Sequence, residues 1–458
     1  MDLGAVSNLS TEDRIVARRM SDAVKVLACL LLCGWYLTGT AAQDNPTSDA
    51  PVPLLRSEHP VDWWFAFKFN AETFPRSDGS KPSCLFGGKA GGSRGYFSKI
   101  GQSFVYASSE NSALQQGDGF IGDSTDDPLG ATFDEIYNGD FFYVVWNDQF
   151  YRDPVLQCEG SSANECGKPW GHSKGLLAWD SEGVGIVIQV TTPDWPGSGG
   201  KALPRAEGNS LGCTMSDDDV DLSQHFFALK LTEPDVLKVL AALKQEGAVT
   251  DTGNSQLVRT GGPPEIVTAV SELGSPNTDA TVTSEKLSSG VRLIAKAGGL
   301  KAPPWQLVSA LLNGMPLRVA SFWSGSKIYS TTSKTRTSCL SKDFGSPGAI
   351  QIALTGSWNG KTIGLSGSSQ KNSDGDPLGA NHAKIGVSTE DGSSLTVLAD
   401  MNQDGVLSGT GSACAVSQNV RGGMFFVLDD QGLHDGITKL IAGKTAPGHA
   451  SAAAPNPQ

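Results

Sequence analysis

Long runs of apolar and aromatic residues constrain this chain most. They are FFYVVWNDQ at 141–149, GLLAW at 175–179 and VGIVIQV at 184–190. A strand that faces water on one side alternates apolar and polar residues, and these runs do not alternate. They therefore predict strands in the middle of a sheet that is covered on both faces.

Further segments predict a mixture of strands and helices. Strands are expected at 60–68, 317–323, 349–354, 384–388 and 395–398. Apolar residues recur every three or four positions at 233–245 and 305–312, which predicts amphipathic helices. Together these elements predict an α/β fold with mixed sheets.

The length of 458 residues is long for one compact core and favours two lobes. We expect a first half at 58–245 and a second half at 286–442. A stretch rich in Gly, Pro, Ser and Thr at 246–285 is expected to connect them. Residues 43–57 are expected to form a flexible leading segment, and 443–458 a disordered tail.

The N-terminal region has the pattern of a secretory signal with a long polar start. A mostly apolar stretch at 24–37 is followed by small residues as far as Ala42, so removal of residues 1–42 is expected. An uncleaved membrane anchor is the alternative. Cleavage predicts a protein that is secreted, or that lies in the periplasm or an acidic vesicle, without stable membrane association.

Six cysteines follow the signal, and an even number in an exported chain predicts disulfides. They allow 15 connectivities. They are Cys84, Cys158, Cys166, Cys213, Cys339 and Cys414. None has zinc-site spacing, and no N-x-S/T glycosylation signal follows the leader.

The acidic balance limits the possible partners. The formal net charge is -13 and the isoelectric point is about 4.9. A protein that binds nucleic acid at neutral pH is expected to be basic. The charge therefore argues against a nuclease that works at pH 7, and less against one that works at acid pH, where carboxylates begin to protonate and histidines become charged.

Two His-x-Lys triplets carry the strongest chemical signal. They place His172 with Lys174 and His382 with Lys384, each at the start of an apolar run. Residues two apart on a strand point to the same face. One imidazole could then attack phosphorus and the other could protonate the leaving oxygen, while the ammonium groups neutralise the phosphate. Such a site needs no metal ion; the alternative is two surface triplets that arose by chance.

The sequence D-M-N-Q-D-G at Asp400 resembles the start of a calcium loop, but Gly411 stands where a glutamate is required. A weak calcium site stays open. The alternative places Asp400 or Asn402 beside the second triplet, where a carboxylate would orient an imidazole. The comparable stretch after the first triplet offers Gln189 and Thr191, which we expect to bind substrate.

Across residues 58 to 442 the chain resembles deoxyribonuclease II. Six landmarks occur in the same order and at similar spacing: PVDW at 60–63, NDQ at 147–149, GHSKG at 171–175, HAK at 382–384, DMN at 400–402 and RGG at 421–423. This family is similar to phospholipase D enzymes. The resemblance implies two similar halves, each a β-sheet flanked by helices, with one active site at a pseudo-twofold interface.

The resemblance also implies an activity. The chain would hydrolyse double-stranded DNA at acid pH, with little sequence preference and without a metal or other cofactor. A phosphohistidine intermediate would leave 3′-phosphate and 5′-hydroxyl ends. His172 would be the nucleophile and His382 the acid, or the reverse. Lys174 and Lys384 would bind the phosphate, and Asp400 would support the site together with Asn402.

The chain departs from the animal members of that family. They carry a further histidine where this chain has Gln189 or a nearby threonine, and a cysteine before PVDW that is absent here. At least one disulfide must therefore differ. The preferred pairs are Cys339 with Cys414 and Cys158 with Cys166. The missing glycosylation signal favours a microbial secreted protein.

Two other functions stay open. A phospholipase D-type enzyme acting on lipid headgroups would keep both triplets but needs an apolar rim near the site. A catalytically inactive paralogue could instead bind DNA or serve as an adhesive surface protein. Lipid and DNA tested side by side as substrates would separate these functions.

Overall fold

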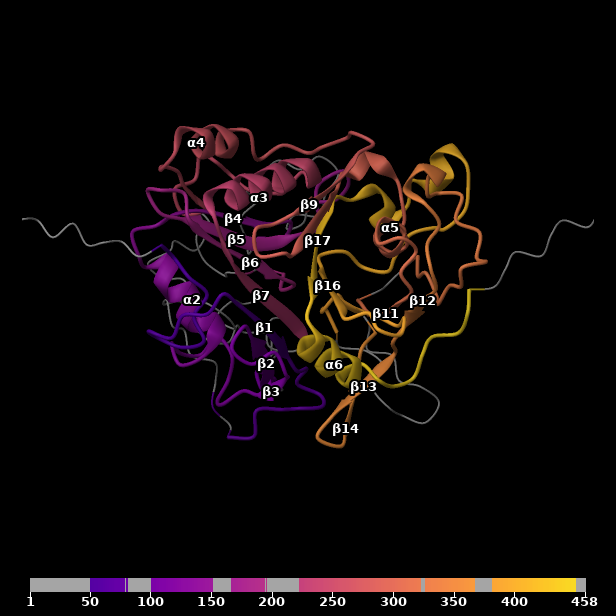
Figure 1. Cartoon of the computed structure of the whole chain (residues 1–458), viewed down its shortest axis with the longest axis horizontal. Coiled ribbons are helices and arrows are strands. Elements are labelled where there is room, and N and C mark those ends of the chain that lie inside the picture. The colour runs from indigo at the N-terminus through magenta and orange to yellow at the C-terminus, as the bar shows by residue number, and fades with distance from the viewer. Residues whose placement is uncertain are drawn as a thin grey trace, which may run out of the picture. The chain divides into compact units, whose positions relative to one another are not determined.

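The computed structural model describes residues 50–78, 80, 100–150, 166–193, 195, 222–322, 326–366 and 381–449. The predicted signal lies outside these residues. Two large sheets, a hairpin and several helices make up the described chain (Figure 1). The predicted α/β class with mixed sheets is confirmed.

The first sheet has eight strands in the order β3-β2-β1-β7-β6-β5-β4-β8, and all neighbours are antiparallel. The strands are β1 (Trp63–Lys68), β2 (Phe104–Ser108), β3 (Gln115–Gln116), β4 (Phe142–Asn147), β5 (Lys174–Trp179), β6 (Gly185–Val190), β7 (Gln224–Leu231) and β8 (Val258–Arg259). Every residue of β5 and β6 is buried, as the uninterrupted apolar runs predict.

The second sheet has seven strands in the order β12-β11-β15-β16-β17-β10-β9. They are β9 (Val282–Lys286), β10 (Arg292–Lys296), β11 (Leu317–Ala320), β12 (Ile350–Ile352), β15 (Ile385–Ser388), β16 (Leu395–Ala399) and β17 (Gly423–Asp429). The pair β11–β12 is parallel, and the other neighbours are antiparallel. A separate hairpin joins β13 (Thr355–Trp358) to β14 (Lys361–Gly364).

The helices are α2 (Pro128–Tyr137), α3 (Glu233–Glu246), α4 (Pro264–Ser271), α5 (Pro304–Leu311) and α6 (Gln431–Leu440), with short 3₁₀ turns η3 (Gly298–Leu300), η4 (Lys342–Phe344), η5 (Gly411–Cys414) and η6 (Ser417–Val420). Helix α3 has acidic residues in its first turn and ends at Gly247, whose φ of 72° suits glycine. It contacts strands of both sheets and lies across their junction (Figure 1). Phe227 of β7 also packs on Phe426 of β17, so the two sheets share a core.

Six strands of each sheet follow the same order. The series β2-β1-β7-β6-β5-β4 in the first sheet corresponds to β9-β10-β17-β16-β15-β11 in the second. The strand at the His-x-Lys triplet takes the same place in both series: β5 lies between β6 and β4, and β15 lies between β16 and β11. This correspondence supports two similar halves; a twofold axis relating them stays a prediction.

The predicted boundaries need two corrections. Residues 50–57 were expected to be flexible, yet Leu54 is buried and its backbone N–H donates to the Thr132 hydroxyl at 2.9 Å. Residues 443–449 were expected to be disordered, yet Ala446 is buried and its N–H donates to the carbonyl of Ile352 at 2.8 Å. Buried apolar side chains and backbone pairing hold both segments. Residues 43–49 and 450–458 lie outside the described residues.

The predicted disulfide between Cys339 and Cys414 is present, with Cα atoms 5.5 Å apart. Cys166 is also disulfide-bonded, and its predicted partner Cys158 lies outside the described residues. None of the described helices combines the length and apolar character that a bilayer span requires.

Candidate active site

Each His-x-Lys triplet is held by the opposite half of the chain. The N–H of His172 donates to the carbonyl of Gly422, just before β17, at 2.9 Å. The N–H of His382 donates to the carbonyl of Ser223, just before β7, at 2.7 Å. These reciprocal backbone contacts bring together two triplets that lie more than two hundred residues apart in sequence.

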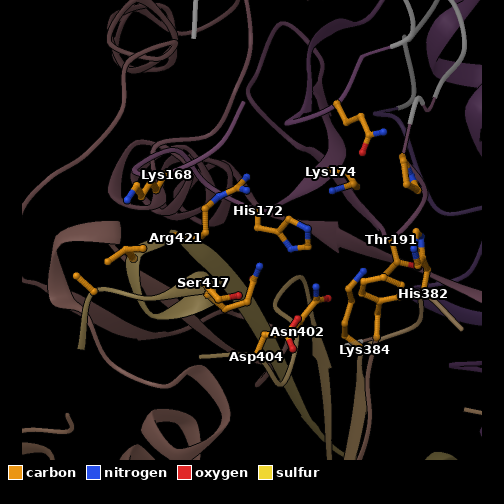
Figure 2. Close-up of a pocket in the computed structure, with 16 residues that line it drawn as sticks. Lys168, His172, Lys174, Thr191, His382, Lys384, Asn402, Asp404, Ser417 and Arg421 are labelled. Carbon is orange, nitrogen blue, oxygen red and sulfur yellow. The ribbon is translucent and has the colours of Figure 1, made fainter. Parts of the chain in front are cut away.

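One cavity of about 540 Å³ receives all four triplet side chains, His172, Lys174, His382 and Lys384. Figure 2 shows His172 in its centre, with Arg421 on one side and His382 and Lys384 on the other. The structure therefore brings the two predicted pairs into one site. Two other predicted site residues, Thr191 and Asn402, also line the cavity. Further polar and charged lining residues are Lys168, Ser417, Gln418 and Asp404.

The ring of His172 has a defined orientation. Its Nδ1 lies 3.1 Å from the backbone carbonyl oxygen of Asp400. A carbonyl oxygen can only accept, so Nδ1 carries the proton and Nε2 of the neutral ring keeps its lone pair.

Lys174 is fixed by a buried carboxylate that had no predicted role. Asp148 follows β4 and accepts hydrogen bonds from Lys174 Nζ and, at 2.7 Å, from Arg421 Nη2. Arg421 also donates to the carbonyls of Trp170 and Gly171, at 2.9 and 2.8 Å. Burial alone would raise the pKa of Asp148, but these cations and His172 hold it well below its usual range. Asp148 therefore stays ionised at acid pH.

The ring of His382 has two side-chain neighbours among the described residues, Gln224 and Phe322. The amide Nε2 of Gln224 lies 3.5 Å from its Nδ1. The ring of Phe322 packs against the ring of His382 in a T-shaped arrangement, with centroids 4.5 Å apart and an interplanar angle of 88°. The two histidines thus share a cavity, and the described neighbours of the two rings are of different kinds.

The prediction for Asp400 needs correction. It was expected to orient an imidazole of the second triplet through its carboxylate, but it contacts His172 of the first triplet through its backbone carbonyl. Its carboxylate is buried and accepts from the N–H of Met424 at 3.2 Å and from the amide of Gln189 at 3.0 Å. The reason is positional: Asp400 follows the end of β16, where the second sheet meets the first triplet.

Gln189 also differs from its prediction as a substrate-binding residue. Its side chain is fully buried and is absent from the cavity lining, because its amide lies between Asp400 and His225. Thr191 does line the cavity, and its hydroxyl bonds the side-chain oxygen of Gln224 at 2.8 Å. Asn402 reaches the cavity as well.

A second buried carboxyl group lies behind the first triplet. Ser173, the middle residue of that triplet, donates to Glu246 at the end of α3. Burial and the nearby Asp400 raise the pKa of Glu246 well above its usual value. Nothing in the spacing of Glu246 from the triplet reveals this contact in the sequence.

The cavity lowers the pKa of both histidines. Burial is the main cause for each, and Lys174 and Lys384 add electrostatic repulsion. Asp148 acts in the opposite direction on both. Either ring therefore takes up a proton only under more acidic conditions than an exposed histidine.

Within the described residues, no cluster of three or more His, Cys, Asp or Glu side chains has a geometry that could hold a metal ion. The Asp400 carboxylate of the calcium-like sequence is occupied by Met424 and Gln189 instead.

Comparison with known proteins gives a family match that includes the first triplet. The family model described as Deoxyribonuclease II matches residues 54–250, a range that contains His172 and Lys174 and ends before His382. No curated protein matches the chain. This match supports assignment of the chain to the deoxyribonuclease II family.

Proposed function

We propose that this chain is an acid endodeoxyribonuclease that hydrolyses DNA without a divalent metal ion, through a phosphohistidine, and leaves 3′-phosphate and 5′-hydroxyl ends. The observation that carries the proposal is the single cavity lined by His172, Lys174, His382 and Lys384. These four side chains can supply a nucleophile, an acid and two cations for one phosphodiester.

In the first step, His172 Nε2 attacks phosphorus. The carbonyl contact at Nδ1 supports this role, because it leaves the lone pair on Nε2. The bond from phosphorus to O5′ breaks, and its electron pair stays on O5′, which takes a proton from charged His382. Lys174 and Lys384 stabilise the charge on the phosphoryl oxygens.

In the second step, water attacks the phosphohistidine. Neutral His382 takes a proton from the water, the bond from phosphorus to Nε2 breaks, and the electron pair returns to His172. The product keeps the phosphate on its 3′ end. His382 is charged again, so the cycle closes without net change in the protein.

The acid optimum follows from the lowered pKa of the histidines. His382 must be charged and His172 neutral at the same time, so the rate should rise and fall with pH. Because burial and the lysines disfavour the charged rings, the active combination exists at acid pH. Secretion into acidic surroundings, or transport to an acidic compartment, through the predicted signal would provide such conditions.

The cavity lining favours DNA over a lipid headgroup. Of the described lining residues, the apolar ones are Pro193, Phe322, Ala415 and Val420. The others are polar or charged, and they do not form the apolar rim that a lipid substrate needs.

The test is cleavage of plasmid DNA at about pH 5 in excess chelator. Wild type should cleave it, and His172→Ala and His382→Ala should each lower the rate by at least about 100-fold. The new 5′ ends should accept phosphate from a polynucleotide kinase without prior phosphatase treatment.

The control is His59→Ala, which removes a partly exposed histidine that pairs with Glu110 outside the cavity. It should keep wild-type activity. Cleavage that requires added calcium or magnesium, or that survives both triplet substitutions, would reject the proposed mechanism.

A further inference from the structure

The side-chain partner of His382 has no counterpart at His172. Gln224 is the first residue of β7 and pairs with Lys68, the last residue of β1. In the second sheet, the same place belongs to Gly423, which begins β17 and pairs with Lys296. The two halves therefore place a glutamine and a glycine at corresponding positions beside their triplets.

Packing enforces this difference. A Cβ atom on Gly423 would lie 2.3 Å from Cγ of Met401, so the second half has no room for a side chain there. Met401 is the second residue after β16, and the corresponding residue after β6 is the smaller Thr192. The first half thus has Gln224 and Thr192 at the two positions where the second half has Gly423 and Met401.

The two partners differ in what they can bond. The carbonyl of Asp400 can only accept from His172 Nδ1, which suits a nucleophile that keeps its proton on Nδ1 throughout. The amide of Gln224 has both a donor and an acceptor group. It can therefore bond His382 Nδ1 whether that atom is bare or protonated.

We propose that Gln224 is the positioning residue of His382, and that its side-chain amide turns over when His382 is protonated. The amide donates to Nδ1 of the neutral resting ring and accepts from Nδ1–H of the charged ring. This inference rests on the proposed function and adds to it the group that prepares the acid.

Thr191 allows the amide to turn without losing a hydrogen bond. In the resting arrangement its hydroxyl donates to Gln224 Oε1 at 2.8 Å. When the amide turns, the Gln224 NH₂ group donates to Thr191 Oγ1, and the hydroxyl proton points instead to the carbonyl of His225, 3.2 Å away. Both arrangements are complete because a hydroxyl can donate and accept.

The resting arrangement also explains why His382 needs activation. With Nδ1 accepting from Gln224, the proton of the neutral ring lies on Nε2, and a neutral imidazole is a very weak acid. A proton added at Nδ1 gives the charged ring, whose Nε2–H can be transferred to O5′. The charged groups that act on this ring are Lys384, Lys174 and Lys68, which oppose protonation, and Asp148, which favours it.

The test compares two substitutions of Gln224. Gln224→Glu offers only acceptors, so it should stabilise the charged ring and move the alkaline limb of the pH–rate profile up by about 1–3 units. Gln224→Met offers no acceptor, so it should move that limb to lower pH and reduce the maximal rate on DNA by about 10-fold to 100-fold.

A second substrate separates positioning of the acid from general damage. Thymidine 3′-(4-nitrophenyl phosphate) releases a nitrophenolate that needs no proton. The burst of nitrophenolate should therefore keep its wild-type rate in Gln224→Met. Thr191→Val, which removes the hydroxyl that bonds Gln224, should lower the alkaline limb on DNA.

Gln306→Met is the matched control, because it makes the same change at a buried glutamine outside the cavity lining. It should leave both rates unchanged. Selective ¹⁵N-histidine spectra should place the proton of neutral His382 on Nε2 in wild type.

Three results would overturn the proposal: an unmoved alkaline limb in both Gln224 variants, equal slowing of both substrates by Gln224→Met, or a resting proton on Nδ1. Failure of the wild type to cleave either substrate would reject the proposed function instead. If Gln224→Met fails to fold, Gln224→Glu and Thr191→Val still test the same proposal.

Discussion

The regions around the two triplets share a backbone plan but not their side chains. Trp146 pairs with Gly175, and Ala320 pairs with Ile385, in each case one residue after the triplet lysine. Counting two residues further along each strand places Asp148 of the first half where the second half has Phe322. The first holds Lys174 by charge, and the second packs on the ring of His382.

The difference teaches how one backbone plan can produce two chemical roles. The reciprocal contacts with Gly422 and Ser223 bring the histidines to one cavity. The residues that follow the neighbouring strands then determine what each ring can bond. Beside His172 lie a carbonyl and the ion-paired lysine of the same triplet, and beside His382 lie an amide and an aromatic ring. The repeated triplet therefore predicts that the two histidines lie in one cavity. It does not predict which chemical role each histidine has.

The largest effect is expected when the charge of the first half is removed with Asp148→Asn. Lys174 and Arg421 would lose their shared carboxylate while staying buried, which should lower the free energy of unfolding by about 3–5 kcal/mol. Displacement of Lys174 should also reduce DNA cleavage by about 100-fold or more. Urea unfolding and plasmid cleavage measure the two effects.

The pH dependence of this effect has a definite sign. The pKa of Asp148 is lower in the folded state than in the unfolded state, so its stabilisation is present above the unfolded value and is lost only as pH falls through the folded value. The loss in Asp148→Asn should therefore be similar at about pH 5 and pH 7. Asp118→Asn, at an exposed site, is the control. A loss that vanishes at pH 5 would contradict the ion pair.

A second substitution tests the packing that separates the halves. Gly423→Gln copies Gln224 into the second sheet, where its Cβ would collide with Met401. The free energy of unfolding should fall by about 1–3 kcal/mol. Adding Met401→Thr, which copies Thr192, should recover part of that loss. If the double variant is no more stable than the single one, the packing explanation of the asymmetry is wrong.

The sequence predicts the strands that carry the triplets because those strands are continuous apolar runs, and β5 and β6 confirm them. It does not predict β7 and β17, although each contains a short apolar run. Their importance comes from Ser223 and Gly422, which precede them and hold the opposite triplet. That pairing depends on how the two sheets meet, which local periodicity does not encode.

The dependence on how the two sheets meet also explains which residues of the candidate site could be predicted from the sequence. The histidines and lysines could be predicted because the triplet itself fixes their relative direction. The wrong role of Asp400 and the missing role of Gln224 arise because both residues act on the triplet of the other half. Contacts of that kind follow from tertiary structure, since the residues are separated by 228 and 158 positions.

The smallest expected effect concerns the middle residue of each triplet, Ser173 in the first and Ala383 in the second. Ser173→Ala makes the first triplet resemble the second and removes the hydrogen bond to Glu246. The free energy of unfolding should fall by about 1 kcal/mol at about pH 5, where Glu246 is protonated.

That loss should grow as pH rises. Burial raises the folded-state pKa of Glu246, so the unfolded state releases its proton first and folding becomes less favourable above the unfolded value. The Ser173 hydroxyl opposes this shift by stabilising the carboxylate, and its removal raises the folded-state pKa further. Urea unfolding of wild type and Ser173→Ala between about pH 5 and pH 8 should give diverging curves. Ala383→Ser should show no such divergence, because it is Ser173 of the first triplet that bonds Glu246. Parallel curves for Ser173→Ala would mean that this contact does not distinguish the two halves.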